Sequence, residues 1–184
     1  MLARGLRLGE ALALRWRDAD LDAKRIRVEH TLEHLRRHPW RLTEPKSASG
    51  RRTVPLIGPA VATLRSQRAR IAALRLAAGP AWNDLDFVFP SAVGTPLDGP
   101  NVYHQFKKLL VRAGLPSSHR PHDLRHSTAT YLLAAGVPAR VVMELLGHSQ
   151  ISLTLNTYSH VLPAMLEDAA ARLESVFPVP SARQ

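Results

Sequence analysis

The hydrophobic residues alternate as in strands in one part of the chain and have helical spacing in most of the rest. This change limits the possible fold more than any other feature. Three short segments between residues 25 and 56 have the pattern of strands, namely 25–32, 40–44 and 52–56. Short links join them, and Lys46 lies in one of these, the turn-forming stretch KSASG. Consecutive strands with short links favour a small three-stranded antiparallel sheet.

Most other segments have helical spacing, with proline near their starts and glycine near their ends. The expected helices cover 6–16, 59–78, 101–113, 121–135, a stretch from Pro138 to Gly147, 151–156 and 163–177. A turn is expected at 18–20, a short strand at 87–89, and a loose tail over 178–184. These elements predict an α+β fold that is mainly helical, with a small three-stranded antiparallel sheet.

Composition narrows the function classes. The chain has 184 residues and is 45% hydrophobic, which suits one domain, or at most two small ones, with a sizeable core. Lysine and arginine outnumber aspartate and glutamate 25 to 15, giving a net charge of +10. That excess favours a polyanionic partner, nucleic acid first and an anionic membrane second.

Several absences exclude other classes. There is no cysteine, which excludes disulfide scaffolds, cysteine-ligated zinc, iron–sulfur clusters and cysteine nucleophiles. No apolar run approaches the roughly 18 residues of a membrane span, and residues 1–5 do not form a signal-peptide core. We therefore expect a cytoplasmic protein with no membrane partner.

Two histidines stand at positions suited to chemistry. His122 and Arg125 lie three residues apart at the start of a helix, so both can face an anion near its positive N-terminus. His148 follows Gly147, which is expected to end a helix, and would therefore lie at a sharp corner. The alternative for the first pair is that His122 caps the helix and Arg125 is a solvated surface cation. The alternative for His148 is an ordinary histidine in a surface loop.

Three further residues are candidates of the same kind. Arg7 can be held by Glu10 at i+3, although such a pair is often only a surface ion pair. Tyr158 could be a core residue, or a nucleophile if its proton is removed. Lys46 could be a solvated lysine in a turn.

Histidine spacing also raises the question of a metal site. His30, His34 and His38 recur every four residues, and His122 and His126 have the same spacing. His30 falls in a strand pattern, Pro39 follows His38, and no HExxH order occurs. There is also no P-loop or Rossmann glycine fingerprint, so we expect neither a metal nor a cofactor.

Five motifs together resemble the catalytic domain of the tyrosine recombinases, the phage integrase family. They are GLRLGEALALRW from Gly5, Lys46 followed by RRTVPL, HDLRHS from His122, LLGHS around His148, and TYSH around Tyr158. They occur in the family's order and with family-like spacing, from Gly5 to His160. The resemblance implies an integrase-type fold and DNA strand cleavage and rejoining.

The resemblance also implies a catalytic set. Tyr158 would attack the scissile phosphate, forming a 3′-phosphotyrosyl link and freeing a 5′-hydroxyl. Arg7 and Arg125 would bracket the non-bridging oxygens, where charge builds in the transition state. The whole set is Arg7, Lys46, His122, Arg125, His148 and Tyr158.

The other three members would handle protons and charge without a metal. Lys46 would be the general acid that protonates the leaving 5′-oxygen, and His122 would assist proton transfer at the tyrosine. His148 would donate a further hydrogen bond to the phosphate.

The resemblance finally implies an organisation and partners. Residues 1–177 would be the catalytic domain, without the helical core-binding domain that precedes it in family members and without the start of its first helix. Double-stranded DNA would be the partner, in a bacterial, nucleoid-associated setting. The helix over 163–177 would dock on a neighbouring subunit of a homo-oligomer, or pack on its own domain.

Three other functions remain open at this stage. The chain could be a catalytically weak or inactive DNA-binding remnant of a recombinase, because its charge alone supports non-specific binding. It could be a tyrosine-nucleophile topoisomerase, which shares the chemistry. A metal-dependent hydrolase that uses the histidines ranks last.

Overall fold

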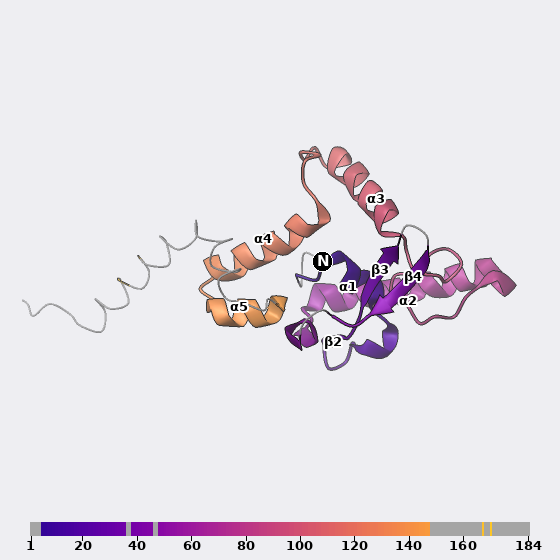
Figure 1. The fold of residues 1–184 in the computed structure, drawn as a ribbon, viewed down its shortest axis with the longest axis horizontal. Coiled ribbons are helices and arrows are strands. Elements are labelled where there is room, and N and C mark those ends of the chain that lie inside the picture. Colours follow the sequence, from indigo (N-terminus) through magenta and orange to yellow (C-terminus); the bar gives the residue numbers. More distant parts are fainter. Residues whose placement is uncertain (1–4, 36–37, 46–47, 148–166, 168–169, 171–184) are drawn as a thin grey trace, which may run out of the picture.

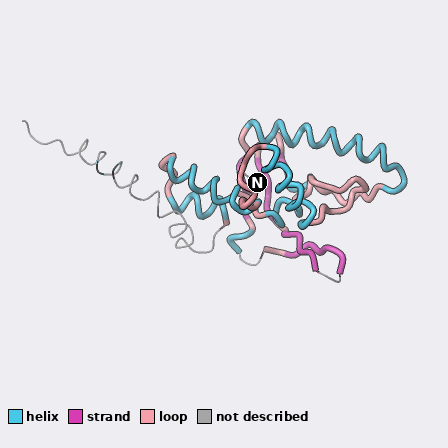
Figure 2. Tube along the Cα trace, turned by 90° about the horizontal axis from the view of Figure 1, so that it is seen from above, coloured by secondary structure: helices cyan, strands magenta, loops and turns pink. Residues whose placement is uncertain are grey.

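The computed structural model describes residues 5–35, 38–45, 48–147, 167 and 170. Figure 1 shows α1 (Leu8–Ala13) near the centre, with α4 (Pro121–Ala134) and α5 (Ala139–Leu146) to one side. The long helix α2 (Gly58–Ala78) extends to the other side, and the loop after it runs back along it (Figure 2). The helix α3 (Gly99–Arg112) connects this loop to α4.

The helices follow the predicted proline and glycine boundaries. Proline occupies the first turn of α2, α3 and α4, where a missing N–H leaves no bond unmade. Pro138 directly precedes α5 as its N-cap instead of opening it, and Gly147 ends α5 in the left-handed conformation with φ of 68°. The first helix is shorter than predicted, because the chain becomes extended at Leu14 and then makes a 3₁₀ turn over Trp16–Asp18.

The structure does not describe most of the C-terminal elements that the sequence predicts. The predicted helices over 151–156 and 163–177 and the tail over 178–184 lie outside the described residues, apart from Glu167 and Ala170, which are helical.

The predicted three-stranded antiparallel sheet is confirmed, but its membership differs. It contains β1 (Ala19–Asp20), β2 (Arg25–Val28) and β5 (Arg52–Pro55), in the order β1-β2-β5. The expected turn at 18–20 therefore contributes an edge strand, because Ala19 pairs with Ile26. At 87–89 there is only an isolated bridge between Phe87 and Arg15.

The predicted strand over 40–44 belongs to a separate hairpin. Here β3 (Thr31–Leu35) pairs with β4 (His38–Thr43), and Leu32 faces Leu42 across the two strands. The single strand predicted over 25–32 is thus split between two sheets. Hydrophobic alternation fixes which face of a strand is buried, but it does not fix the partner strand.

Two apolar clusters form the described core. The larger one fills the space between the sheet, α1 and α2, and includes Ile26, Val54, Val61 and Val88. The smaller one lies between α4 and α5 and includes Ala129, Leu133, Val142 and Leu146. Leu145 packs against the first cluster while Leu146 belongs to the second, so the end of α5 is fixed to both.

The described part of the chain contains no helix long and apolar enough to cross a membrane.

Candidate active site at the end of helix α5

The C-terminal end of α5 is bound by three arginines from three other segments. The Leu145 carbonyl accepts from Arg52 Nε at 2.8 Å, and the Leu146 carbonyl accepts from Arg125 Nη2 at 2.5 Å. The Gly147 carbonyl accepts from Arg7 Nη2 at 3.2 Å. The last carbonyls of a helix have no partner within the helix and carry its partial negative charge, so cations bind there favourably. We call Arg7, Arg52 and Arg125 the arginine cluster.

Arg125 is the most deeply buried member. It projects from the second turn of α4 and is only 1% exposed. Besides Leu146, it donates from Nη1 to the Gly5 carbonyl at 2.6 Å. The two backbone carbonyls fix the plane of the guanidinium before any ligand arrives, which is the kind of preorganisation that makes an anion site effective.

Arg7 is held by the ion pair that the sequence predicts. It is the N-cap residue of α1, and its Nη1 lies 2.7 Å from Oε1 of Glu10. The Arg7 backbone N–H donates to the other oxygen of Glu10 at 2.9 Å, so the carboxylate satisfies both groups. The side chain of Arg7 is still 41% exposed, so it is far more accessible to solvent than Glu10.

Arg52 and the burial of Glu10 are features that motif reading missed. Glu10 is 3% exposed and receives a two-pronged contact from Arg52, with Nη2 at 2.9 Å and Nη1 at 3.2 Å. Burial alone would raise the pKa of Glu10, but the hydrogen bonds and charge of Arg52, together with the hydrogen bonds of Arg7, hold the pKa below its ordinary value. The sequence did contain a signal that Arg52 points inward. Arg52 lies two residues before the buried Val54 on the same strand, and residues two apart share a face.

His122 lies within electrostatic reach of the same arginines. It is exposed on the first turn of α4, and its ring meets that of His126 edge-on at a centroid distance of 4.7 Å. Although the residue is exposed by surface area, the surrounding protein desolvates its ring enough to lower the pKa of His122, and the charges of His126, Arg125 and Arg7 lower it further. A neutral imidazole at pH 7 can accept a proton, as a base requires.

The structure therefore brings together two of the six candidate residues, Arg7 and Arg125, and places His122 one turn before Arg125 on α4. The other three, Lys46, His148 and Tyr158, lie outside the described residues. Within the described ranges, no group of three or more histidine, aspartate or glutamate side chains is arranged to hold a metal ion.

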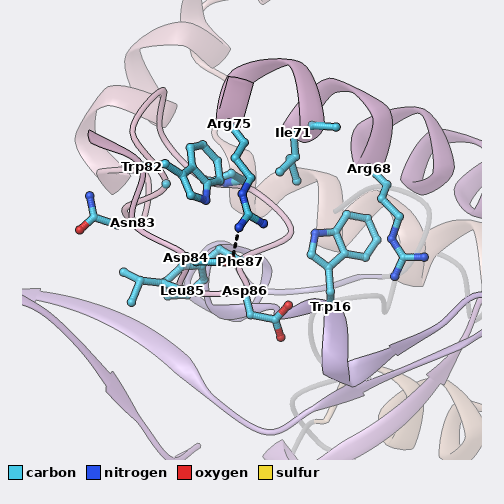
Figure 3. Close-up of a pocket in the computed structure, with 13 residues that line it drawn as sticks. Trp16, Arg68, Ile71, Arg75, Trp82, Asn83, Asp84, Leu85, Asp86 and Phe87 are labelled. Carbon is cyan, nitrogen blue, oxygen red and sulfur yellow. Dashed lines mark ion pairs between the residues drawn. The ribbon is translucent and has the colours of Figure 1, made fainter. Parts of the chain in front are cut away.

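A separate pocket of about 320 Å³ lies between α2 and the loop over 82–94 (Figure 3). Trp16 and Trp82 form part of its wall, and the Arg68 guanidinium stacks on Trp16 at 4.7 Å. Arg75 pairs with Asp84 across its rim at 3.1 Å. Its lining includes no member of the arginine cluster, so we treat it as separate from the candidate active site.

Comparisons with known proteins identify the family of this chain. The model of the phage integrase family matches residues 1–165, and the chain belongs to this family of tyrosine recombinases. It is 36% identical to a XerC-like tyrosine recombinase of Caldanaerobacter subterraneus, over 94% of this chain and 47% of that protein. It is 39% identical to an integrase of Saccharopolyspora erythraea, over 72% of this chain and 30% of that protein.

Solved structures of integrases and recombinases also match the fold of this chain. The Tn1549 transposon integrase in complex with circular intermediate DNA matches with a TM-score of 0.77 and 26% identity, over 95% of this chain and 57% of that one. The XerH site-specific recombinase, in a post-cleavage complex with its difH substrate, matches with a TM-score of 0.64 and 26% identity, over 94% and 43%. This chain spans about half or less of the length of the two curated relatives.

Proposed function

We propose that this chain is the catalytic domain of a recombinase that cleaves and rejoins double-stranded DNA through a 3′-phosphotyrosyl intermediate. The observation that carries the proposal is the convergence of Arg7 and Arg125 on the adjacent carbonyls of Gly147 and Leu146. Two guanidiniums this close suit the two non-bridging oxygens of one phosphodiester. His148 follows Gly147 directly in the sequence and would supply a third donor.

In the cleavage step, the Tyr158 oxygen forms a bond to phosphorus as the bond from phosphorus to the 5′-oxygen breaks. His122, whose pKa is lowered, is suited to receive the phenol proton. Lys46 donates a proton to the departing 5′-oxygen. Rejoining is the reverse reaction, in which a 5′-hydroxyl attacks the phosphotyrosyl link, so no external energy source is consumed.

Charge supports this role for the arginines. The transition state places extra negative charge on the phosphate oxygens, and without a metal ion the side chains must stabilise it. Glu10 and the α5 carbonyls bind the arginines on the protein side, which fixes the direction of their guanidiniums. Loss of one such donor typically slows the reaction on the order of 10²- to 10³-fold.

The wider organisation is also a proposal. Residues 1–177 would form the catalytic domain, and the helix predicted over 163–177 would dock on a neighbouring subunit in a homo-oligomer on bacterial nucleoid DNA. Because this chain spans only part of the length of its relatives, recombination by a whole protein of their length is likewise a proposal.

The test uses a DNA substrate with a nick beside the cleavage site, so that the covalent product is trapped. The chain has three tyrosines, which allows a matched set of variants. We expect a protein–DNA adduct with the native chain, with Tyr131→Phe and with Tyr103→Phe, but not with Tyr158→Phe. Tyr131 is a suitable control, because it is 71% exposed on α4.

The possible results separate the functions. An adduct that survives Tyr158→Phe would place the nucleophile elsewhere. DNA binding with no adduct under any condition would favour a DNA-binding remnant, and relaxation of a supercoiled plasmid without pairing of two sites would favour a topoisomerase.

A further inference from the structure

Arg52 is the member of the arginine cluster that the proposed chemistry does not use. Its side chain is 7% exposed, and it donates to three different segments. These are Glu10 on α1, the Leu145 carbonyl at the end of α5, and the Gly50 carbonyl at 3.1 Å in the turn before β5. A single planar guanidinium thus joins three segments that are far apart in the sequence.

Glu10 connects Arg52 to Arg7. Oε1 of Glu10 accepts from Nη1 of both arginines, while Oε2 accepts from Arg52 Nη2 and from the Arg7 backbone N–H. These four bonds fill the acceptor capacity of the carboxylate. The direction of the Glu10 carboxylate, and with it that of Arg7, therefore depends on Arg52.

Arg52 also lies where two loops of the candidate site meet. The turn over 48–50 follows Lys46 in the chain, and its Gly50 carbonyl is bound by Arg52. A side chain on Gly147 would lie 2.8 Å from Arg52 Nη1 and 2.7 Å from the Ser49 carbonyl oxygen, so the turn and the helix end are closely packed. Arg52 is thus the side chain that touches both the segment after Lys46 and the segment before His148.

We propose that Arg52 is a positioning residue, which holds the 48–50 turn, the Glu10–Arg7 pair and the end of α5 in the arrangement that cleavage needs. It acts through Glu10 and the backbone, and not by contact with the phosphate. The proposal rests on the recombinase function above for its kinetic consequence, but its structural consequence can be measured without DNA.

The key variant is Arg52→Gln, and the neighbouring Arg51 provides a matched control. Arg51 is half exposed and pairs with Glu44, which is 74% exposed. Arg51→Gln therefore removes the same charge from the residue just before β5 without touching the arginine cluster. We measure the rate of adduct formation on nicked DNA at saturating substrate, and separately the Kd for the same DNA. Displacement of reacting groups by about 1 Å can slow a reaction on the order of 100-fold, so we expect a loss of about that size in Arg52→Gln.

The substitution of Arg52 should change the affinity for DNA much less than the rate of adduct formation. We expect the Kd of Arg52→Gln to stay within about twofold of that of Arg51→Gln, because both lose one charge. Arg52→Lys keeps the charge but cannot reproduce the two-pronged contact with Glu10, so we expect it to recover part of the rate. It also serves as the test variant if Arg52→Gln does not fold. A rate for either Arg52 variant equal to that of Arg51→Gln would overturn the proposal.

Hydrogen exchange provides the readout that does not depend on catalysis. In the free protein, we expect the amides near the end of α5 to exchange faster in Arg52→Gln than in Arg51→Gln, while those of α2 stay unchanged. Equal exchange at α5 in the two variants would overturn the positioning role. If the native chain forms no adduct, the proposed function fails, and the exchange data still decide whether Arg52 holds the helix end.

Discussion

Gly147 offers a sharp test of how tightly the candidate site is packed. Its φ of +68° lies in the left-handed region, and an added Cβ would approach the Ser49 carbonyl oxygen to 2.7 Å. Gly136 also has a positive φ, +76°, but an added Cβ there would meet nothing within 4 Å. The pair Gly147→Ala and Gly136→Ala therefore separates close packing from backbone strain.

The expected magnitudes follow from these two terms. The left-handed conformation costs an alanine about 1–2 kcal/mol at either position. At Gly147 the contact is with a backbone oxygen that cannot rotate away, and overpacking of this kind costs about 1–3 kcal/mol more. The gain from a stiffer unfolded chain is common to both variants and cancels in the comparison.

Urea unfolding, followed by circular dichroism, measures the difference. With a slope of about 2 kcal/mol per molar urea, the midpoint of Gly147→Ala should lie roughly 0.5–1.5 M below that of Gly136→Ala. Equal midpoints would refute the claim that the 48–50 turn is pressed against the end of α5.

Two further predictions concern titratable groups. Glu10→Gln should lower the free energy of unfolding by about 3–5 kcal/mol at pH 7, because it breaks a buried ion pair, whereas Glu44→Gln on the surface should cost less than about 1 kcal/mol. Since the pKa of Glu10 is lowered in the folded state, its stabilisation is present above its ordinary value of 4.5 and is lost as the pH falls below it. Urea unfolding at pH 7 and pH 4 checks both points, and an unchanged pH dependence in Glu10→Gln would contradict them. The pKa of His122 is also lowered, so proton NMR should detect its titration below 6.5, and adduct formation should weaken as the pH falls through that titration. Titration of His122 above 6.5 would contradict the lowered pKa, and adduct formation that does not change through its titration would contradict its role as the base.

The sequence predicted the boundaries of α2, α3, α4 and α5 closely, because these boundaries depend on local chemistry. Proline at the start of α4 and glycine at the end of α5 act through their own backbone preferences, which any reader of the sequence can apply. The pairing of Arg7 with Glu10 is equally local, at i+3.

The strand partners and the role of Arg52 depend on contacts between distant segments. Alternation over 25–32 was correct in kind, but it could not indicate that the chain changes sheets after Val28. Arg52 looked like one of many basic residues, and only its bonds to Glu10 and Leu145 distinguish it from exposed Arg51.

The bonds that assemble the site join the two ends of the described chain. Arg7 reaches Gly147 across 140 positions of sequence, and Arg125 reaches Gly5 across 120. During translation, a chain that has emerged only as far as α3 contains the first arginine but neither Arg125 nor the helix end that both arginines bind. A nascent polypeptide therefore cannot bring Arg7 and Arg125 together at the end of α5 until synthesis is well advanced. Under the proposed function, this chain order would delay DNA cleavage until most of the domain has been made.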